Sequence, residues 1–475
     1  MWILKDLAKS GFSGFSKIMK NGKVASARSV VPPLTGFAWP SIYTGKEPKE
    51  HKANNFFVIN KNYTLDITFY DPKRAKPFWE QLAEAGYKSL IITPPAVVKP
   101  PKSEKIDMIT GFPLKQKTNS KELASLMKRY SFNEAEGIEK DIEGLHASLN
   151  QITKKLKENI RKKVKIAEYM INKHEYDLVF VCFSETDELG HFAMGKEWKR
   201  FMFPILREID SFLAYLVKRV EEENSLLMLI SDHGMQKIDY KFLITSWLIK
   251  KRFAYLKNID IARSKKKRKG GEKLYVLRDY LLRSKLSYIY KLLPLSFKHY
   301  LMNFAEKFLV ERQKGNFVKV YPSDLDMAKT KAFAFMTIDP VCEIFINDKR
   351  FVNGIVSSTD KERIKRELIR ELKIAKDDKG DKIFQQVWDG KEFYSENKVF
   401  INPDIFAYAR NNLTIDPMHY SETKLFMKPE AARKGDHMLY GIFGFYPKGR
   451  INVKLKDFKI TEFAPIVLKY ELDKE

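Results

Sequence analysis

The fold of this chain is indicated by the stretch Leu226-Leu227-Met228-Leu229-Ile230-Ser231-Asp232-His233-Gly234-Met235. It opens with an apolar run bounded by polar residues, which is typical of a buried strand. Asp232 and His233 follow at the carboxyl end of that strand, where ligands bind in open α/β sheets. An aspartate beside a histidine suits a borderline metal ion such as zinc. Such a pair alone is more often a local hydrogen-bond arrangement in a turn, so partners elsewhere in the sequence decide between the two interpretations.

A second strand of the same kind supplies possible partners. Residues 177–183 form the clearest buried strand in the sequence, and Asp187 and His191 follow it. Their spacing puts both side chains on one face of a helical turn, where they can reach one ion or simply contact each other. The carboxyl ends of parallel strands lie on one edge of a sheet, so these two residues can meet Asp232 and His233 there. The convergence predicts a metal site.

The composition fits a globular α/β protein and leaves its partners open. The chain has 475 residues, which is enough for about two or three average domains or for one enzyme domain with insertions. Short apolar runs alternate with helical patterns, which favours the α/β class. With 86 Lys and Arg against 60 Asp and Glu, the formal charge of +26 attracts polyanions, although a lysine-rich solubilising surface explains it equally well.

Cysteine content and hydropathy bear on localisation. The sequence contains only Cys182 and Cys342, which excludes a disulfide framework and favours a reducing interior. We therefore predict a cytoplasmic protein, with peripheral membrane contact as an alternative. No stretch approaches the roughly 20 apolar residues of a membrane span, so no transmembrane segment is predicted.

The segment 237–328 differs in character from its surroundings. It contains a basic cluster at residues 263–269 and a Leu- and Tyr-rich helical pattern at residues 281–293. We interpret it as a basic insertion or cap, and we assign residues 1–236 and 329–475 to one catalytic domain. The basic cluster can contact an anionic membrane or another polyanion. A solvated loop is the more frequent explanation, because no aromatic residue interrupts its run of lysines.

Two further polar residues stand out by their positions. Pro32 and Pro33 enforce an extended approach to Thr35, which suits a presented hydroxyl. A threonine in a Pro- and Gly-rich loop is, however, usually a turn or cap residue. His437 lies in what looks like a loop that enters an apolar run, and it is either a distant third ligand or an ordinary surface histidine.

Four separated motifs, taken in order, resemble the type I phosphodiesterase/nucleotide pyrophosphatase branch of the alkaline phosphatase superfamily: Thr35, Asp187 with His191, Asp232 with His233, and His437. The resemblance runs from Pro32 to the C-terminal helix and is weakest in the insertion. It implies an alkaline phosphatase-like, three-layer α/β/α fold with a central, mostly parallel sheet and an inserted cap.

The resemblance also implies a phosphoryl-transfer site with two divalent metal ions, most often zinc. One ion would be held by Asp187, His191 and His437. The other would be held by Asp232, His233 and the oxygen of Thr35. Thr35 would be the nucleophile, since metal coordination favours the alkoxide of an otherwise weakly nucleophilic hydroxyl. Asn54 or Asn55 lies near the position where the family has an asparagine that contacts a phosphoryl oxygen of the substrate.

The sequence departs from the family at its beginning. The family opens with a strand that ends in an aspartate ligand of the second ion, and this sequence starts downstream of that strand. Its first residues instead have the pattern of an amphipathic helix that includes Asp6, so Asp6 does not replace the ligand. We therefore expect a fold whose N-terminal strand is missing, either because the start codon is placed too late or because the protein is shortened.

The leading hypothesis is a zinc-dependent hydrolase that cleaves phosphodiester or pyrophosphate bonds in a phosphorylated small molecule. A phosphomonoesterase, mutase or phosphotransferase of the same superfamily would share the metals and differ in the pocket. A truncated, inactive member that binds anionic lipid or nucleic acid is the alternative from another class. A sulfatase is disfavoured, because no Cys-x-Pro-x-Arg or Ser-x-Pro-x-Arg motif occurs.

Overall fold

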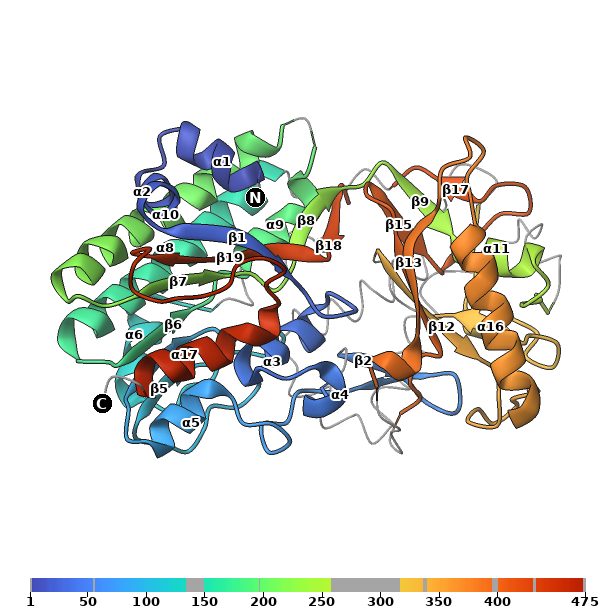
Figure 1. Ribbon diagram of the computed structural model, residues 1–475, viewed down its shortest axis with the longest axis horizontal. Helices are drawn as coiled ribbons and strands as arrows, with labels where there is room; N and C mark the ends of the chain where they lie inside the picture. The colour runs from blue at the N-terminus through green and yellow to red at the C-terminus, as the bar shows by residue number, and fades with distance from the viewer. Residues whose placement is uncertain are drawn as a thin grey trace.

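The chain forms two lobes that lie side by side, and both termini are in the larger one (Figure 1). The computed structural model describes residues 2–53, 56–133, 149–195, 197–257, 317–335, 340–394, 400–429 and 433–472. Three predictions fall outside these ranges, namely the substrate contacts of Asn54 and Asn55, the basic cluster at residues 263–269 and the helical pattern at residues 281–293.

The central layer of the larger lobe consists of two three-stranded sheets. The first has three parallel strands in the order β5 (Ile106–Ile109), β4 (Ser89–Ile92) and β6 (Leu178–Val181). In the second, the middle strand is antiparallel to both neighbours, in the order β1 (Lys23–Arg28), β19 (Tyr440–Tyr446) and β7 (Leu227–Ile230). The strands predicted at residues 177–183 and 226–230 are confirmed as β6 and β7.

β6 and β7 are each an edge strand of their own sheet. No backbone ladder joins β6 to β7 within the described part of the chain. The first described element is a helix, α1 (Trp2–Lys9), as the opening pattern of the sequence predicts. Asp6 lies within α1 and pairs with Lys199 (2.7 Å), so it takes no part in the strand ends of the central layer.

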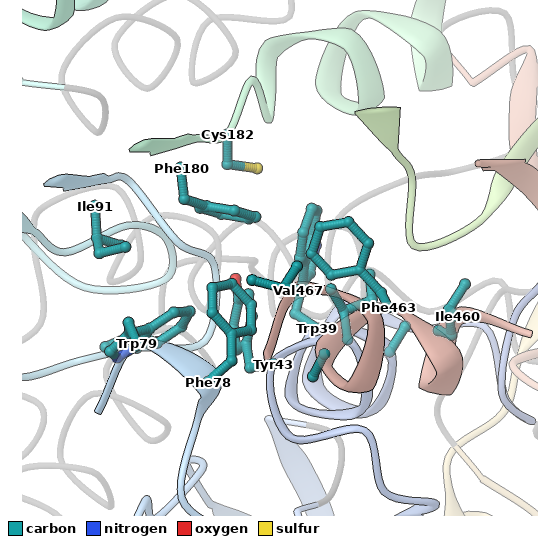
Figure 2. Packing of buried hydrophobic residues seen from close by; sticks show 14 of the residues in the cluster. Trp39, Tyr43, Phe78, Trp79, Ile91, Phe180, Cys182, Ile460, Phe463 and Val467 are labelled. Atoms are coloured by element: carbon teal, nitrogen blue, oxygen red, sulfur yellow. The ribbon is translucent and has the colours of Figure 1, made fainter. Parts of the chain in front are cut away.

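One face of both sheets is covered by α3 (Thr35–Thr44), α5 (Phe78–Glu84) and α17 (Phe463–Leu472). Side chains alternate along a strand, so Ile91 and Phe180 point to this face and share one core with Phe443 of the second sheet. Figure 2 shows the aromatic side chains that surround Phe180: Trp39, Tyr43, Phe78 and Trp79. Burying a large apolar side chain contributes about 1.5–3 kcal/mol, and this packing fixes α3 to the sheet.

The opposite face is covered by α1 and by four longer helices: α2 (Ser13–Asn21), α6 (Lys121–Arg129), α8 (Leu149–Lys173) and α10 (Trp198–Glu222). The strand residues that point away from the first face, such as Ile92, contact these helices. Figure 1 shows the strands between the two helical layers, so the predicted three-layer α/β/α arrangement is confirmed. None of the helices in the described ranges is both long enough and apolar enough to cross a membrane.

The smaller lobe contains an antiparallel sheet in the order β11 (Ala332–Ala334), β12 (Val341–Ile346), β14 (Ile405–Ala409) and β13 (Phe384–Asp389). A second sheet has the order β15 (Leu413–Asp416), β9 (Tyr240–Leu243) and β17 (Phe426–Met427). Two helices pack against these strands, α11 (Ile244–Lys250) and α16 (Ser358–Ile374).

The core of the smaller lobe combines residues from distant parts of the chain. Phe242, Ile344 and Leu368 belong to one buried cluster. The described part of the predicted insertion 237–328 therefore packs against residues that follow it, and the boundaries of the insertion stay a prediction. Short elements complete the fold: α4 (Pro48–His51), β2 (Phe57–Ile59), β3 (Leu65–Ile67), β10 (Val318–Lys319), β16 (His419–Tyr420) and the 3₁₀ turns at residues 322–324, 390–392 and 460–462.

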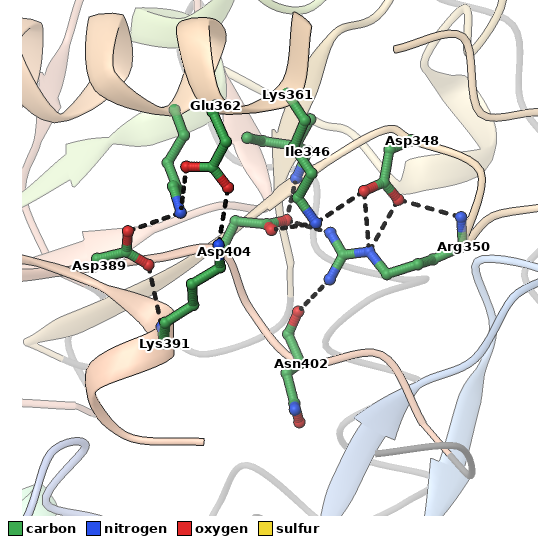
Figure 3. A network of polar contacts seen from close by, with 10 residues as sticks. Ile346, Asp348, Arg350, Lys361, Glu362, Asp389, Lys391, Asn402 and Asp404 are labelled. Atoms are coloured by element: carbon green, nitrogen blue, oxygen red, sulfur yellow. Dashed lines mark hydrogen bonds and ion pairs between the residues drawn. The ribbon is translucent and has the colours of Figure 1, made fainter. Parts of the chain in front are cut away.

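A network of charged side chains ties α16 to the sheet of the smaller lobe (Figure 3). Arg350 Nε lies 2.8 Å from Asp348 Oδ1, and Lys361 Nζ lies 2.8 Å from Asp348 Oδ2 and 3.0 Å from Asp404 Oδ1. Arg350 also contacts Asp404. Each carboxylate thus has two cationic partners, and the side chain of Asp348 is only 5% exposed.

We predict that the ionised carboxylate of Asp348 stabilises the fold and that this stabilisation is lost in acid. Burial raises the pKa of Asp348, but hydrogen bonds from Arg350 and Lys361 outweigh this effect, and the pKa is lowered overall. A lowered folded-state pKa stabilises the protein above the unfolded value of about 3.9, and this stability is lost as the pH falls through the folded value. Asp348→Asn should lower the unfolding free energy at pH 7 by about 1.5–3 kcal/mol.

Urea unfolding followed by circular dichroism between pH 6 and pH 2 checks this prediction. The free energy of unfolding should fall less steeply with acid in Asp348→Asn than in the wild type. Asp378→Asn, a substitution at an exposed aspartate outside the network, is the matched control. Equal acid dependence in Asp348→Asn and the wild type would remove this role from Asp348.

Candidate metal centre

The polar residues predicted at two strand ends converge in the structure, together with His437. Asp187 and His191 lie on α9 (Glu185–Ala193), which follows β6. Asp232 and His233 occupy the turn between β7 and β8 (Gly234–Lys237). His437 lies on β18 (Gly435–Met438), whose antiparallel pairing with β8 places it opposite the residue after Gly234. The prediction of a loop at His437 is therefore wrong, because this segment is held in a strand by β8.

The side chains of these residues surround Asp187. Its Oδ1 atom lies 3.6 Å from His191 Nε2, 3.9 Å from His233 Nε2 and 3.4 Å from His437 Nε2. The Nε2 atoms of His191 and His437 are 3.1 Å apart. Asp232 Oδ2 lies 3.3 Å from His233 Nε2. Five of the six residues predicted as metal ligands, all except Thr35, therefore form one cluster of nitrogen and oxygen atoms.

The cluster is mostly buried, including the Oδ1 atom of Asp187, and the remainder of the Asp187 side chain reaches solvent. The side chain of His233 is 5% exposed, whereas that of Asp187 is 35% exposed. Ligand atoms of Asp187, His233 and His437 all lie within 4.8 Å of one another, so these three can hold one ion. This set contains His233 in place of His191, which differs from the grouping that the family resemblance implies.

Backbone carbonyls set the orientation of two of the imidazoles. His191 Nδ1 donates to the carbonyl oxygen of Gly435 (3.1 Å), and His233 Nδ1 donates to that of Gly234 (3.0 Å). A carbonyl oxygen only accepts hydrogen bonds, so the proton of each neutral ring is on Nδ1 and the lone pair is on Nε2. Metal-binding histidines are usually oriented in this way. Both Nε2 lone pairs therefore face the cluster.

The charge states of the two carboxyl groups differ. Desolvation raises the pKa of Asp187, but His191 and His437, when protonated, outweigh it through their charges and hydrogen bonds and hold this pKa well below its usual range. Desolvation also raises the pKa of Asp232, and here the neighbouring His233 compensates only in part. Two carboxylates and three imidazoles in a partly dry site are a donor set that fits a divalent ion such as zinc.

Two glycines allow α9 and β18 to approach closely enough for the cluster to form. A Cβ atom on Gly435 would lie 2.1 Å from the carbonyl oxygen of Gly190, and a Cβ atom on Gly190 would lie 2.8 Å from the side chain of Met235. Next to this contact, the backbone N–H of Lys434 donates to the carbonyl oxygen of His191 (2.8 Å). Sequence reasoning missed these glycines, although each stands one or two residues before a predicted histidine ligand.

A buried carboxylate beside His437 holds the backbone of β18 in place. Asp436 is fully buried and accepts hydrogen bonds from Arg433 Nη2 (2.9 Å), the His437 N–H (3.0 Å) and the hydroxyl of Thr414. The side-chain amide of Gln236 donates to the carbonyl oxygen of His437 (3.1 Å). These partners were not predicted, since they depend on the pairing of β8 with β18.

Thr35 is the first residue of α3 and is half-buried. The chain reaches it from β1, where Arg28 pairs with Tyr440, and the N–H of Ser29 donates to the carbonyl oxygen of Leu439 (2.8 Å). This hydrogen bond ties the segment that leads to Thr35 to the segment that follows His437. Within the described ranges, no hydrogen bond or ion pair joins its side chain to the cluster. The N–H groups at the start of a helix favour phosphate binding.

Comparisons with known proteins agree with this fold. A sequence model of the type I phosphodiesterase/nucleotide pyrophosphatase family matches residues 3–364. The search of curated proteins gave no match. Phosphonoacetate hydrolase from Sinorhizobium meliloti 1021, in complex with phosphonoacetate, aligns with a TM-score of 0.52 and 12% identity over 99% of this chain and 93% of that chain. Wild-type alkaline phosphatase PafA aligns with a TM-score of 0.51 and 14% identity over 99% of this chain and 93% of that chain. The predicted alkaline phosphatase-like fold is confirmed.

Proposed function

The chain belongs to the type I phosphodiesterase/nucleotide pyrophosphatase family, and from this membership we propose that it is a metal-dependent hydrolase of phosphodiester or pyrophosphate bonds. The observation that carries the proposal is the cluster around Asp187, in which three imidazole nitrogens lie within 3.9 Å of one carboxylate oxygen. An arrangement of this kind is costly without a cation and is the donor set that zinc prefers.

We propose two divalent ions, both zinc. One would be held by Asp187, His191 and His437, and the other by Asp232, His233 and the oxygen of Thr35. The 4.8 Å grouping of Asp187, His233 and His437 supports one ion in the cluster, although it combines ligands of the two proposed positions. When bound, such ions neutralise charge on the phosphoryl group and favour ionisation of a coordinated hydroxyl.

The residues of the chain would act on a phosphorylated small molecule as follows. Thr35 Oγ would form a bond to phosphorus as the bond from phosphorus to the leaving alcohol or nucleotide breaks. Water would then hydrolyse the phospho-threonine and restore the hydroxyl. The N–H groups in the first turn of α3 would orient the phosphoryl oxygens, and Asn54 or Asn55 would contact one of them.

A phosphomonoesterase, mutase or phosphotransferase would use the same cluster with a different pocket. The fold alone does not separate these activities. A cytoplasmic location and contact of residues 263–269 with an anionic membrane or polyanion stay predictions from the sequence.

Hydrolysis of two chromogenic esters tests the proposed function. We expect purified protein supplied with zinc to cleave bis(p-nitrophenyl) phosphate faster than p-nitrophenyl phosphate, to lose activity with a chelator and to regain it with zinc. Faster cleavage of the monoester would favour the phosphomonoesterase. Zinc-loaded protein that cleaves neither ester would contradict the hydrolase and favour an inactive binding protein.

A further inference from the structure

A lysine and a glutamate form an ion pair beneath α9 with almost no contact with water. Lys163 comes from α8, and Glu185 is the first residue of α9. Their side chains are 0% and 1% exposed, and Lys163 Nζ lies 3.0 Å from Glu185 Oε1 and 3.1 Å from Oε2. Neither residue is a proposed ligand, and within the described part of the chain no hydrogen bond or ion pair joins either side chain to a proposed ligand.

The same lysine also holds the end of β6. Lys163 Nζ donates to the carbonyl oxygen of Cys182 (2.8 Å), and the Thr93 hydroxyl donates to the same oxygen (2.9 Å). Cys182 comes directly after β6, and Glu185 opens α9. Lys163 thus bridges both sides of the turn that sets the direction in which α9 leaves the sheet.

The pair anchors the face of α9 that is turned away from the ligands. An α-helix turns by about 100° per residue, so Asp187 and His191 lie about 200° and 240° around the helix axis from Glu185. Fixing Glu185 against α8 therefore fixes the rotation of α9, and with it the direction in which both ligand side chains point.

Stability alone does not account well for such a pair. Removing two charges from water costs several kcal/mol per ion, and apolar replacements of similar volume are often neutral or stabilising. Three of the four positions one turn away on α8, Ile160, Ile166 and Ala167, are buried and apolar, and the fourth, Asn159, is buried and polar. Most of this environment therefore suits an apolar side chain. A directional contact, in contrast, fixes geometry in a way that apolar packing does not.

We propose that Lys163 and Glu185 are positioning residues that hold α9 in the orientation required for metal binding by Asp187 and His191. This inference rests on the proposed function. It assigns the two residues no contact with substrate or metal, and it predicts that their loss weakens metal binding more than it weakens the fold.

Cobalt titration of the full chain tests the inference. Co²⁺ reports both affinity and ligand geometry through its visible absorption, and zinc competition gives the zinc affinity. Lys163→Met leaves Glu185 buried without its partner, whereas the paired variant Lys163→Met/Glu185→Met leaves no unpaired charge. Lys365→Met is the matched control, because Lys365 is a 3% exposed lysine that pairs with Asp389 (2.6 Å) in the smaller lobe.

We expect both Lys163 variants to bind metal about 10–100-fold more weakly, as is typical when an orienting partner of a metal ligand is lost. Their cobalt spectra should change, the melting temperature of the paired variant should match that of the wild type, and Lys365→Met should keep the wild-type affinity and spectrum. If Lys163→Met does not fold, the paired variant carries the test. If the folded paired variant has the metal affinity and cobalt spectrum of the wild type, the positioning role is wrong, while the proposed function is unaffected. If the wild type binds neither cobalt nor zinc, the proposed function on which the inference rests is wrong.

Discussion

Thr35→Ala is expected to lower the turnover of a phosphodiester by about 10⁴–10⁶-fold, the loss typical of removing a catalytic nucleophile. The methyl side chain cannot form the bond to phosphorus, while the start of α3 keeps its N–H groups. Zinc content should change little, since Asp187, His191 and His437 remain. Steady-state kinetics with bis(p-nitrophenyl) phosphate and metal analysis of the same preparation measure the two effects separately.

Thr35→Ser is the matched control, because it keeps the hydroxyl and removes only a methyl group. It should retain most of the turnover that Thr35→Ala loses. Full diesterase activity in Thr35→Ala would take the nucleophile role from Thr35. Loss of both turnover and zinc in that variant would instead make Thr35 chiefly a metal ligand.

Gly435→Ala is expected to abolish stable metal binding and activity together. The added Cβ atom would lie 2.1 Å from the carbonyl oxygen of Gly190, so α9 and β18 have to separate. That movement breaks the hydrogen bond from His191 Nδ1 to the carbonyl oxygen of Gly435 and increases the 3.1 Å separation of His191 Nε2 and His437 Nε2. Zinc titration calorimetry and the diesterase assay on one preparation measure both losses.

Gly449→Ala is the control for this substitution, since an added Cβ atom there meets nothing within 4 Å. It should keep the zinc affinity and activity of the wild type. Circular dichroism should show that Gly435→Ala retains its helices and strands, because the contact involves one edge of the fold. A folded Gly435→Ala protein with wild-type zinc affinity would show that the close approach of α9 and β18 is not needed for the site.

The sequence predicts the larger lobe well because its elements have strong local patterns. Both β6 and β7 are continuous apolar runs, and α8 and α10 repeat apolar residues at helical spacing over 25 residues each. In contrast, β18 reads Gly-Asp-His-Met, with neither an apolar run nor an alternation to mark it as a strand. Its strand structure depends on pairing with β8, which is a non-local contact.

The candidate site is predictable to the extent that its residues follow strand ends. Asp187 and Asp232 lie where the sequence places them, because the carboxyl ends of β6 and β7 face the same edge of the central layer. The supporting contacts could not be predicted in this way. Lys163 stands in a lysine-rich stretch of α8 whose other lysines are mostly at the surface, and only the tertiary packing shows that this one is buried.

The core of the smaller lobe also depends on contacts between residues far apart in the sequence, which local patterns do not predict. Phe242 and Leu368 share a core although more than a hundred residues separate them in the sequence. Composition predicts a basic, solvated segment at residues 263–269, but it does not predict that Phe242 before this segment packs with Leu368 after it. The domain boundaries proposed from composition therefore stay predictions.

The metal centre is tested most directly by the zinc affinity of the wild type beside that of His437→Ala, measured by calorimetry on protein stripped with a chelator. We predict that the wild type binds zinc and that His437→Ala loses more than the roughly 10–100-fold typical of outer-shell changes. His174→Ala should keep the wild-type affinity, since His174 pairs with Glu122 (2.8 Å) on the surface of α6. A wild-type protein that binds no zinc, or equal zinc affinity in the wild type and His437→Ala, would contradict the metal centre.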